Sequence, residues 1–255
     1  MSAEDLKRTG NVLSPADHQH LVSVELARLA GLKTEHLAAP IPHIEGWTVH
    51  NVVGHTGWVF RWVALTMAAE PDVAPQRADV PEPPAGPDVL AWFDESVRVV
   101  FEALETLDPE RSVTTFTGPQ SASWWLRRMA HETSMHRWDA EAAIASPEPI
   151  DADIARDGID EIFEVFVPHR LQFDVLNGKG ETIHLHATDV EDGEWVATLG
   201  ADEVSWEHAH TKADVAAKGS VSDLLLLLWS RLPPSRLDTF GDASLLDRWQ
   251  QAAKF

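Results

Sequence analysis

The sequence contains no cysteine. This absence excludes disulfides, cysteine-ligated zinc and a cysteine nucleophile, so any thiol chemistry must use a thiol supplied from outside the chain. The longest apolar run, Leu224 to Trp229, is far too short to cross a bilayer. The first ten residues carry no apolar core of the secretory-signal type, and we therefore expect a cytoplasmic protein.

Basic residues are scarce relative to acidic ones. Lys and Arg number 20 against 41 Asp and Glu, which gives a formal net charge of −21. A surface this acidic repels phosphate backbones and anionic lipids, so we expect neither nucleic-acid binding nor membrane docking. Hydrophobic residues make up 44% of the 255 residues, which is typical of a globular protein with one large or two ordinary domains.

The first half of the chain has the apolar periodicity of amphipathic helices. A frayed leader over residues 1–14 precedes four expected helices, over residues 15–37, 49–69, 88–107 and 124–143. The proline-rich stretch 71–87 predicts an extended loop between the second and the third helix. Helices of this length joined by loops predict a four-helix bundle, a fold that builds metal sites from side chains on facing helices.

The second half begins after a short proline-punctuated linker, Ser146 to Pro149. It predicts one helix over residues 154–167, four short strands, and two further helices over residues 221–231 and 243–253. The strands are expected over residues 182–187, 194–199, 203–208 and 213–218. The sequence therefore predicts an α+β protein, with a helical bundle over residues 1–149 and a small α/β domain with an antiparallel sheet over residues 150–255.

The fourth expected helix carries Glu132 and His136, which are four residues apart and share one helix face. A carboxylate and an imidazole in this arrangement form half of a transition-metal site, although such pairs are more often surface interactions. The neighbouring His131 lies five residues from His136, about 140° around the helix, so the zincin arrangement of two histidines is not met. We expect His131 either to pack in the core or to form a hydrogen bond to one of the metal-ligating side chains.

His55 lies in an apolar second helix between Gly54 and Gly57. Glycines weaken a helix, and they are tolerated where another helix or a ligand approaches closely. His55 is thus either a metal ligand or a core histidine bonded to a backbone carbonyl. Two histidines and one carboxylate leave a coordination position open, as in catalytic rather than structural zinc sites.

Other histidines and one arginine have competing interpretations. His50 is expected at the surface, while the strand pairs His184/His186 and His208/His210 each face one side of the sheet. We interpret these strand histidines as solvated rather than metal-binding. Arg231 is expected at the end of a very apolar helix, where it either complements the helix dipole or receives a carboxylate in bidentate fashion.

Several segments carry a resemblance to a known family. They are Gly46-Trp47-Thr48-Val49, Val53-Gly54-His55, Ala130-His131-Glu132, His136 to Glu141, and Asp223-Leu224 to Trp229-Ser230-Arg231. In these motifs and their order the chain resembles the mycothiol-dependent maleylpyruvate isomerase family, which belongs to the DinB-like superfamily of metal-binding four-helix bundles.

The resemblance implies a divalent metal, usually zinc, held by His55, Glu132 and His136. It also implies mycothiol as a thiol cosubstrate, a small electrophilic substrate that bears a carboxylate, and a C-terminal domain that covers the site and contributes Arg231. The chain departs from the family where Ile44-Glu45 replace a common Cys-Pro pair and where Ser230 replaces the usual glycine.

Two reactions share the first chemical step that the resemblance implies. In cis–trans isomerisation the thiolate adds to a double bond and is later eliminated, whereas an S-transferase stops at the adduct. A non-catalytic protein that binds or senses a metal or small ligand is the alternative from another class. A thiol-independent hydrolase with Glu132 as general base conflicts with Glu132 acting as a ligand.

Overall fold

A computed structural model describes residues 13–70, 73–106 and 108–254. Most of the predicted leader, residues 1–12, lies outside the described residues. The chain separates into two compact units, one formed by Leu13–Glu148 and the other by the residues from Pro149 onward. Within the described residues, no helix is long and apolar enough to span a membrane.

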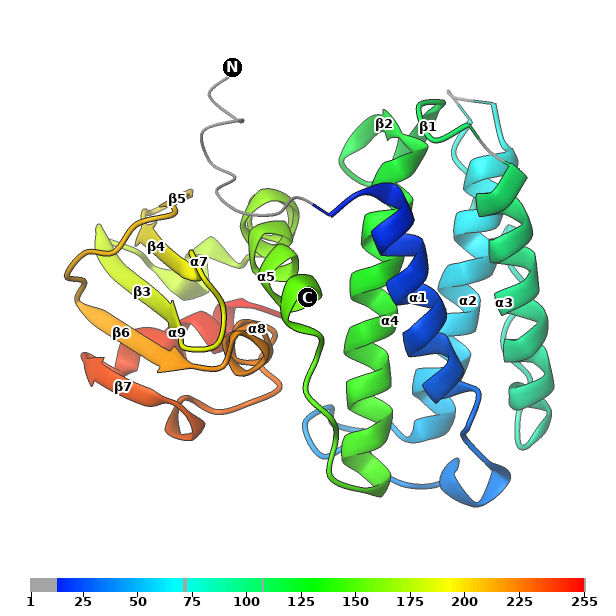
Figure 1. The fold of residues 1–255 in the computed structure, drawn as a ribbon, viewed down its shortest axis with the longest axis horizontal. Coiled ribbons are helices and arrows are strands. Elements are labelled where there is room, and N and C mark those ends of the chain that lie inside the picture. The colour runs from blue at the N-terminus through cyan, green and yellow to red at the C-terminus, as the bar shows by residue number, and fades with distance from the viewer. Residues whose placement is uncertain (1–12, 71–72, 107, 255) are drawn as a thin grey trace. The chain divides into compact units, whose positions relative to one another are not determined.

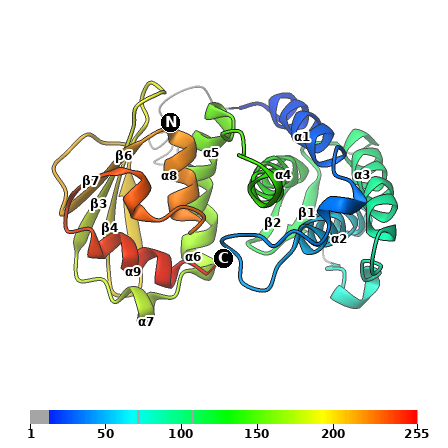
Figure 2. The same cartoon turned by 90° about the horizontal axis from the view of Figure 1, so that it is seen from below.

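The first unit is built from four long helices that run side by side (Figures 1 and 2). They are α1 (Pro15–Leu29), α2 (Val49–Ala68), α3 (Asp88–Thr106) and α4 (Ala122–Ile144), with short 3₁₀ turns at Thr34–His36 and Arg77–Asp79. Helix α2 packs on α3 and α4, and α1 packs on α4. The four predicted helices are confirmed, except that the first ends eight residues earlier than expected.

Local hydrogen bonds define where these helices begin. The Oγ of Ser14 accepts from the backbone N–H of Asp17 at 3.2 Å, and the Asp17 carboxylate accepts from the Ser14 N–H at 2.8 Å. Pro15 follows at the first helical position, where no N–H is needed. At the start of α2, the Asn51 side chain accepts from the backbone N–H of Thr48 at 2.9 Å.

The two glycines around His55 do permit a close approach. A Cβ on Gly57 would lie 2.5 Å from the ring of Trp92 on α3, and one on Gly54 would lie 3.1 Å from Pro83. Both glycines therefore let α3 and the preceding loop pack directly on the α2 backbone.

A buried charge pair ties α1 to α4. The Arg137 side chain is 1% exposed and donates from Nε to the Glu25 carboxylate at 2.6 Å. Its Nη1 also donates to Glu141 at 3.0 Å and to the backbone carbonyl of Glu148 at 2.6 Å. These acceptors together satisfy the buried guanidinium of Arg137. Without them, burial of its charge would cost much free energy.

A short hairpin of β1 (Ser112–Thr115) and β2 (Gly118–Ser121) precedes α4, where the sequence predicted only a loop. Its turn depends on Gly118, whose φ of +103° suits glycine alone. Helix α4 follows directly, with Ser121 at its N-cap position.

The second unit contains a five-stranded sheet in the order β5-β4-β3-β6-β7. Its strands are β3 (Glu181–Ala187), β4 (Glu194–Leu199), β5 (Val204–Glu207), β6 (Val215–Gly219) and β7 (Asp238–Gly241). Neighbouring strands are antiparallel except β3 and β6, which run parallel. A parallel pair requires a crossover connection, which residues 208–214 provide between β5 and β6. The sheet is therefore mixed rather than wholly antiparallel, and β7 was not predicted.

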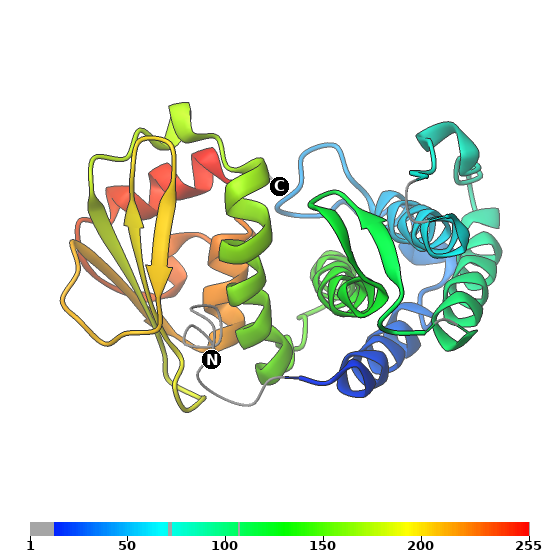
Figure 3. The ribbon, with the colours of Figure 1, turned by 90° about the horizontal axis from the view of Figure 1, so that it is seen from above.

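Helices cover one face of this sheet (Figures 2 and 3). They are α5 (Ala152–Glu161), which continues through a π-helical turn (Ile162–Phe166) into α6 (Val167–Arg170), then α7 (Phe173–Leu176), α8 (Val221–Leu228) and α9 (Ser244–Ala252). A 3₁₀ turn, Pro234–Arg236, lies between α8 and β7. Buried Ile183, Leu185 and Trp195 alternate along β3 and β4, and the Trp195 indole donates to Asp160 of α5 at 2.7 Å. The predicted α+β class is confirmed, with a helical first region and a sheet in the second.

Candidate metal centre

Three predicted ligands come together inside the helical unit. The Nε2 of His55 on α2 lies 3.0 Å from Oε1 of Glu132 on α4, and the Nε2 of His136 lies 3.2 Å from the same oxygen. The ligand-type atoms of all three side chains lie within 4.8 Å of one another. We call His55, Glu132 and His136 the bundle trio.

A second carboxylate orients His136 from outside the trio. The buried Oδ2 of Asp139 accepts from Nδ1 of His136 at 3.0 Å, and its Oδ1 accepts from Nε2 of His43 at 2.6 Å. Metal-binding histidines commonly donate their other ring N–H to a carboxylate in this way, which fixes the direction of the ligating nitrogen. Asp139 follows His136 by three residues, a spacing visible in the sequence but not used in the prediction. His43 lies in a loop and gives no such signal.

Arg128 holds the other oxygen of the trio's carboxylate. Its Nη2 donates to Oε2 of Glu132 at 2.9 Å, and its side chain is only 4% exposed. Arg128, Glu132 and His136 follow one another at intervals of four residues, so they form a row along α4. Glu132 is thereby turned so that Oε1 alone faces the two imidazoles.

Trp47 packs against both imidazoles of the trio. Its ring centroid lies 5.4 Å from that of His55 and 6.4 Å from that of His136, with the latter pair nearly parallel. In the sequence, Trp47 stood out only as part of the Gly46 to Val49 motif. Side-chain exposure rises from 9% at His136 and 15% at Glu132 to 39% at His55, so the trio opens to solvent on the His55 side.

The charges of these groups perturb one another. Burial opposes ionisation of Glu132, but the charge of His136, hydrogen bonds from His136 and His55, and the Arg128 charge hold its pKa well below the usual range. Burial likewise opposes protonation of His136, yet Glu132 and Asp139 raise the pKa of this imidazole to about 9. His136 is thus an imidazolium between two carboxylates at neutral pH.

The donor set fits a divalent metal of the zinc type. Two imidazole nitrogens and one carboxylate oxygen are ligands that zinc binds in catalytic sites. The Nε2 of His136 and Oε1 of Glu132 form an ion pair, and a divalent cation that replaces the proton would bind the same two atoms. The Nδ1 of His136 remains occupied by Asp139, so only Nε2 is directed to the trio.

The remaining predicted residues have other surroundings. His131 is buried and its ring contacts His18 of α1 edge-on at 6.4 Å, while His50 bonds the Pro84 carbonyl at 3.1 Å rather than lying freely at the surface. Arg231 lies past the end of α8, which stops at Leu228 and not at residue 231 as predicted. Its Nη1 donates to the Trp229 carbonyl at 3.0 Å, in keeping with the helix-end interpretation.

The four histidines predicted on strands are grouped differently from the prediction, because His210 joins His184 and His186 while His208 is buried elsewhere. His184 and His186 do share one face, but β5 ends at Glu207, so His208 and His210 do not alternate along a strand. His208 is buried beside Trp195, with its Nε2 3.3 Å from Asp160. His210 instead lies beside His184 and His186.

Comparison with known proteins places these features in a family. Residues 20–141 match the mycothiol maleylpyruvate isomerase N-terminal domain, and residues 153–248 match the C-terminal domain of the same family. The crystal structure of a mycothiol-dependent maleylpyruvate isomerase mutant superposes with a TM-score of 0.65 at 16% identity, over 89% of this chain and 93% of that chain.

A second crystal structure, of the mycothiol-dependent maleylpyruvate isomerase itself, gives a TM-score of 0.62 at 16% identity, over 86% of this chain and 90% of that chain. Curated protein sequences give no match. The two structures share the fold, and the two matched domains together extend over most of the sequence. The chain belongs to the mycothiol-dependent maleylpyruvate isomerase family.

Proposed function

We propose that this protein is an enzyme that uses a divalent metal and mycothiol to act on a small, carboxylate-bearing electrophile. The reaction is either cis–trans isomerisation of the maleylpyruvate type or transfer of the thiol to the substrate. The observation that carries the proposal is the bundle trio, which supplies three ligands rather than the four of a structural zinc site.

The residues that hold the metal in this proposal are His55, Glu132 and His136. When bound there, zinc supplies a Lewis acid that lowers the pKa of a coordinated thiol and so provides a nucleophile at neutral pH. The chain has no cysteine of its own, so the nucleophile comes from outside.

The surrounding side chains prepare this site before any substrate arrives. Asp139 and His43 hold the His136 ring, and Arg128 compensates the charge of Glu132 on the side away from the imidazoles. The Trp47 indole packs against the two imidazoles and limits their movement. Preorganisation of this kind removes the cost of ordering ligands during turnover.

The proposed chemistry begins with addition of the thiolate sulfur to one carbon of a conjugated cis double bond. A carbon–sulfur bond forms, the double bond becomes single, and the electron pair moves onto the conjugated carbonyl as an enolate. Rotation about the new single bond and loss of the thiolate restore the double bond in the trans form. In the transferase, protonation of the enolate ends the reaction at the thioether.

Arg231 is the residue we assign to the substrate carboxylate. A guanidinium binds a carboxylate in bidentate fashion and stabilises negative charge that develops on a neighbouring carbonyl. The observed bond from Arg231 to the Trp229 carbonyl uses Nη1. In this proposal the guanidinium exchanges that bond for the substrate.

Product analysis tests the proposal. Zinc-loaded protein is incubated with mycothiol and maleylpyruvate, and the products are separated and identified by mass and by NMR. An isomerase yields the trans isomer with mycothiol regenerated, whereas a transferase consumes one thiol per substrate. His55→Ala is expected to abolish either product. Zinc binding without any turnover of maleylpyruvate or of other conjugated acids would overturn the proposal in favour of a non-catalytic binding protein.

A further inference from the structure

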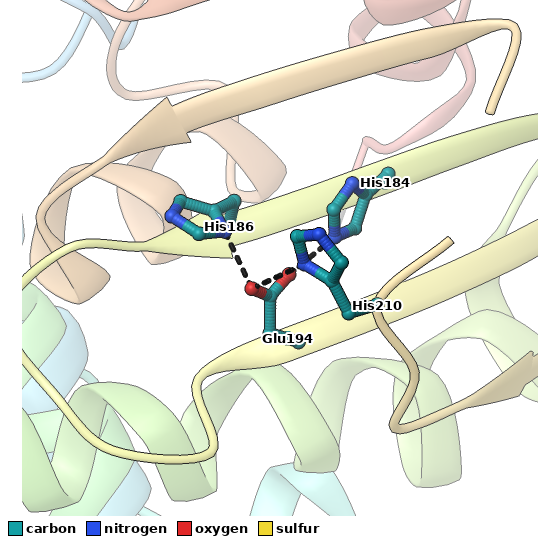
Figure 4. A group of neighbouring side chains, drawn as sticks. All are labelled: His184, His186, Glu194 and His210. Carbon is teal, nitrogen blue, oxygen red and sulfur yellow. Dashed lines mark hydrogen bonds and ion pairs between the residues drawn. The ribbon is translucent and has the colours of Figure 1, made fainter. Parts of the chain in front are cut away.

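A second group of ligand-type side chains lies on the sheet of the C-terminal unit. It consists of His184 and His186 of β3, Glu194 at the start of β4, and His210 in the connection from β5 to β6. Figure 4 shows the four side chains turned toward one another. Their ligand-type atoms all lie within 4.8 Å of one another. We call this group the sheet cluster.

Strand register accounts for three of its members. His186 pairs directly with Glu194 across the antiparallel β3–β4 ladder, and His184 lies two residues earlier on the same face. Ile183 and Leu185 point to the opposite face and are buried, and Trp195, which pairs with Leu185, donates to Asp160 of α5. The sheet cluster therefore occupies the outer face, away from α8 and α9.

The crossover connection supplies the fourth member. Residues 208–214 lead from the edge strand β5 to β6, on the far side of β3 in the sheet order. His210 lies in this connection, and its Nδ1 is 2.8 Å from Oε1 of Glu194. Its ring centroid is 5.4 Å from that of His184 although the side chain is 74% exposed. The imidazole is thus largely exposed to solvent and yet lies beside the other members of the sheet cluster.

One carboxylate faces three imidazoles in this cluster. The Oε2 of Glu194 accepts from Nε2 of His184, while Oε1 accepts from Nδ1 of His186 at 2.5 Å and from Nδ1 of His210. Burial opposes ionisation of Glu194, yet these bonds and the histidine charges lower its pKa below the usual range. Three ring nitrogens are thus directed at the two oxygens of one carboxylate.

We propose that the sheet cluster is a second metal site, which binds a borderline divalent ion such as zinc through His184, His186, Glu194 and His210. Imidazole-rich sets favour zinc, copper or nickel over magnesium or calcium. Tetrahedral zinc with bonds of 2.0–2.1 Å separates its ligand atoms by about 3.3 Å, which small side-chain rotations reach from the present spacing.

Four protein ligands make this site closed, unlike the bundle trio. Closed sites are structural, and their binding energy adds to the folding free energy. The ion would join β3, β4 and the β5–β6 connection, and so hold the crossover that makes β6 parallel to β3. The sheet site is independent of the bundle trio and of the proposed reaction, since it takes all its residues from the second unit.

Metal stoichiometry of the untagged full-length protein tests the inference. After chelation, zinc loading and exhaustive dialysis, elemental analysis should give two zinc ions per wild-type chain and one in His55→Ala. The double variant His184→Ala/His186→Ala should retain one, and its combination with His55→Ala none. His169→Ala, an exposed histidine of the same unit, is the matched control and should retain both.

Further readouts keep the test decisive where a strand variant fails to fold. His210 is 74% exposed, so His210→Ala removes a ligand without removing core contacts. In the His55→Ala background, cobalt should give the intense visible bands of a tetrahedral site, and His210→Ala should abolish or strongly weaken them. Zinc should also raise the Tm of His55→Ala, and this rise should disappear with His210→Ala.

Two results would overturn the proposal. One is a His55→Ala protein that retains no zinc after dialysis, since this variant leaves the sheet cluster intact. The other is a folded His55→Ala/His210→Ala protein that retains the same zinc and the same cobalt spectrum. A wild type with one zinc that His55→Ala keeps would instead support the sheet site and contradict the bundle trio, so the two proposals fail separately.

Discussion

Replacement of Asp139 by Asn tests the bundle trio most directly. This side chain touches no proposed substrate and is not a proposed ligand, but it accepts from both His136 and His43 and is fully buried. Removal of such an outer carboxylate typically weakens metal affinity 10- to 100-fold, which is about 1.4–2.7 kcal/mol of binding free energy. We therefore expect Asp139→Asn to raise the zinc Kd within this range while the fold is kept.

The structure indicates which end of that range to expect. The Asn side chain has one oxygen, which accepts, and one NH2 group, which donates and cannot accept from an imidazole N–H. If this oxygen faces His136, the NH2 group faces Nε2 of His43. This nitrogen can accept the hydrogen bond when the proton of the neutral imidazole is on Nδ1. Both hydrogen bonds then survive and only the charge is lost, so we expect a change of about tenfold, at the lower end of the range.

The choice of pH removes an opposing effect. Asp139 also raises the pKa of His136, so its removal weakens proton competition at neutral pH and hides part of the lost affinity. The titration should therefore be done near pH 9, with a chelator that buffers free zinc. Asp94→Asn, an exposed carboxylate on α3, is the control and should leave the Kd unchanged. An Asp139→Asn protein with wild-type Kd at this pH and a native circular dichroism spectrum would refute the role of Asp139 in orienting His136.

Further outcomes follow from the same contacts. Glu132→Gln should lose zinc from the bundle, measured by elemental analysis in a His210→Ala background; retained zinc with lost activity would favour the general-base hydrolase instead. His136, whose pKa is raised to about 9, must lose a proton to bind zinc, so affinity should rise about tenfold per pH unit up to pH 9 and then level off. In metal-free protein, protonated His136 also stabilises the fold. This contribution is complete below the unfolded pKa of about 6.5 and is lost as the pH rises through 9, which denaturation of chelated protein measures. Ser230→Gly should increase the free energy of unfolding by about 1 kcal/mol, measured in urea, because Ser230 has a φ of +58°. Glu25→Ala should lower it by about 3 kcal/mol or more, because it leaves a buried guanidinium without its closest carboxylate.

The helices were predictable because the apolar periodicity of each helix ends where capping or helix-breaking residues occur in the sequence. Helices α2 and α3 end within one residue of their predicted limits, at positions where proline or a change of polarity stops the pattern. Helix α8 ended earlier than predicted because Ser230 adopts the left-handed conformation that reverses the chain. Ser230, which the resemblance marked as a departure from glycine, is therefore the point where the chain leaves the helix.

The strands show where local reasoning ends. The hairpin of β1 and β2 and the short strand β7 were missed because each strand has only four residues, too few to establish a period of two. In addition, β2 and β7 contain proline, glycine or aspartate, which strands disfavour. The parallel pairing of β3 with β6 depends on where the chain returns after β5. No local spacing encodes that path.

The site was predictable to the extent that it lies on one helix. Glu132 and His136 follow from four-residue spacing, and the flanking glycines drew attention to His55. Asp139 was visible at the next turn of the same helix, whereas His43 reaches it from 96 residues away. The sheet cluster escaped prediction for the same reason, since His210 meets His184 only through the crossover.

The buried ion pair between Arg137 and Glu25 fixes the rotation of α4 next to the proposed metal centre. Consecutive residues on a helix point about 100° apart and rise 1.5 Å, so a slip of α4 by one residue would turn His136 away from His55. Arg137 is the next residue after His136 and is anchored on α1, which prevents such a slip. Changes on α1 that loosen this anchor should therefore rotate the proposed zinc ligands on α4, even though no α1 residue belongs to the bundle trio. Engineering that redesigns the outer surface of α1 has wide freedom, provided that Glu25 is kept.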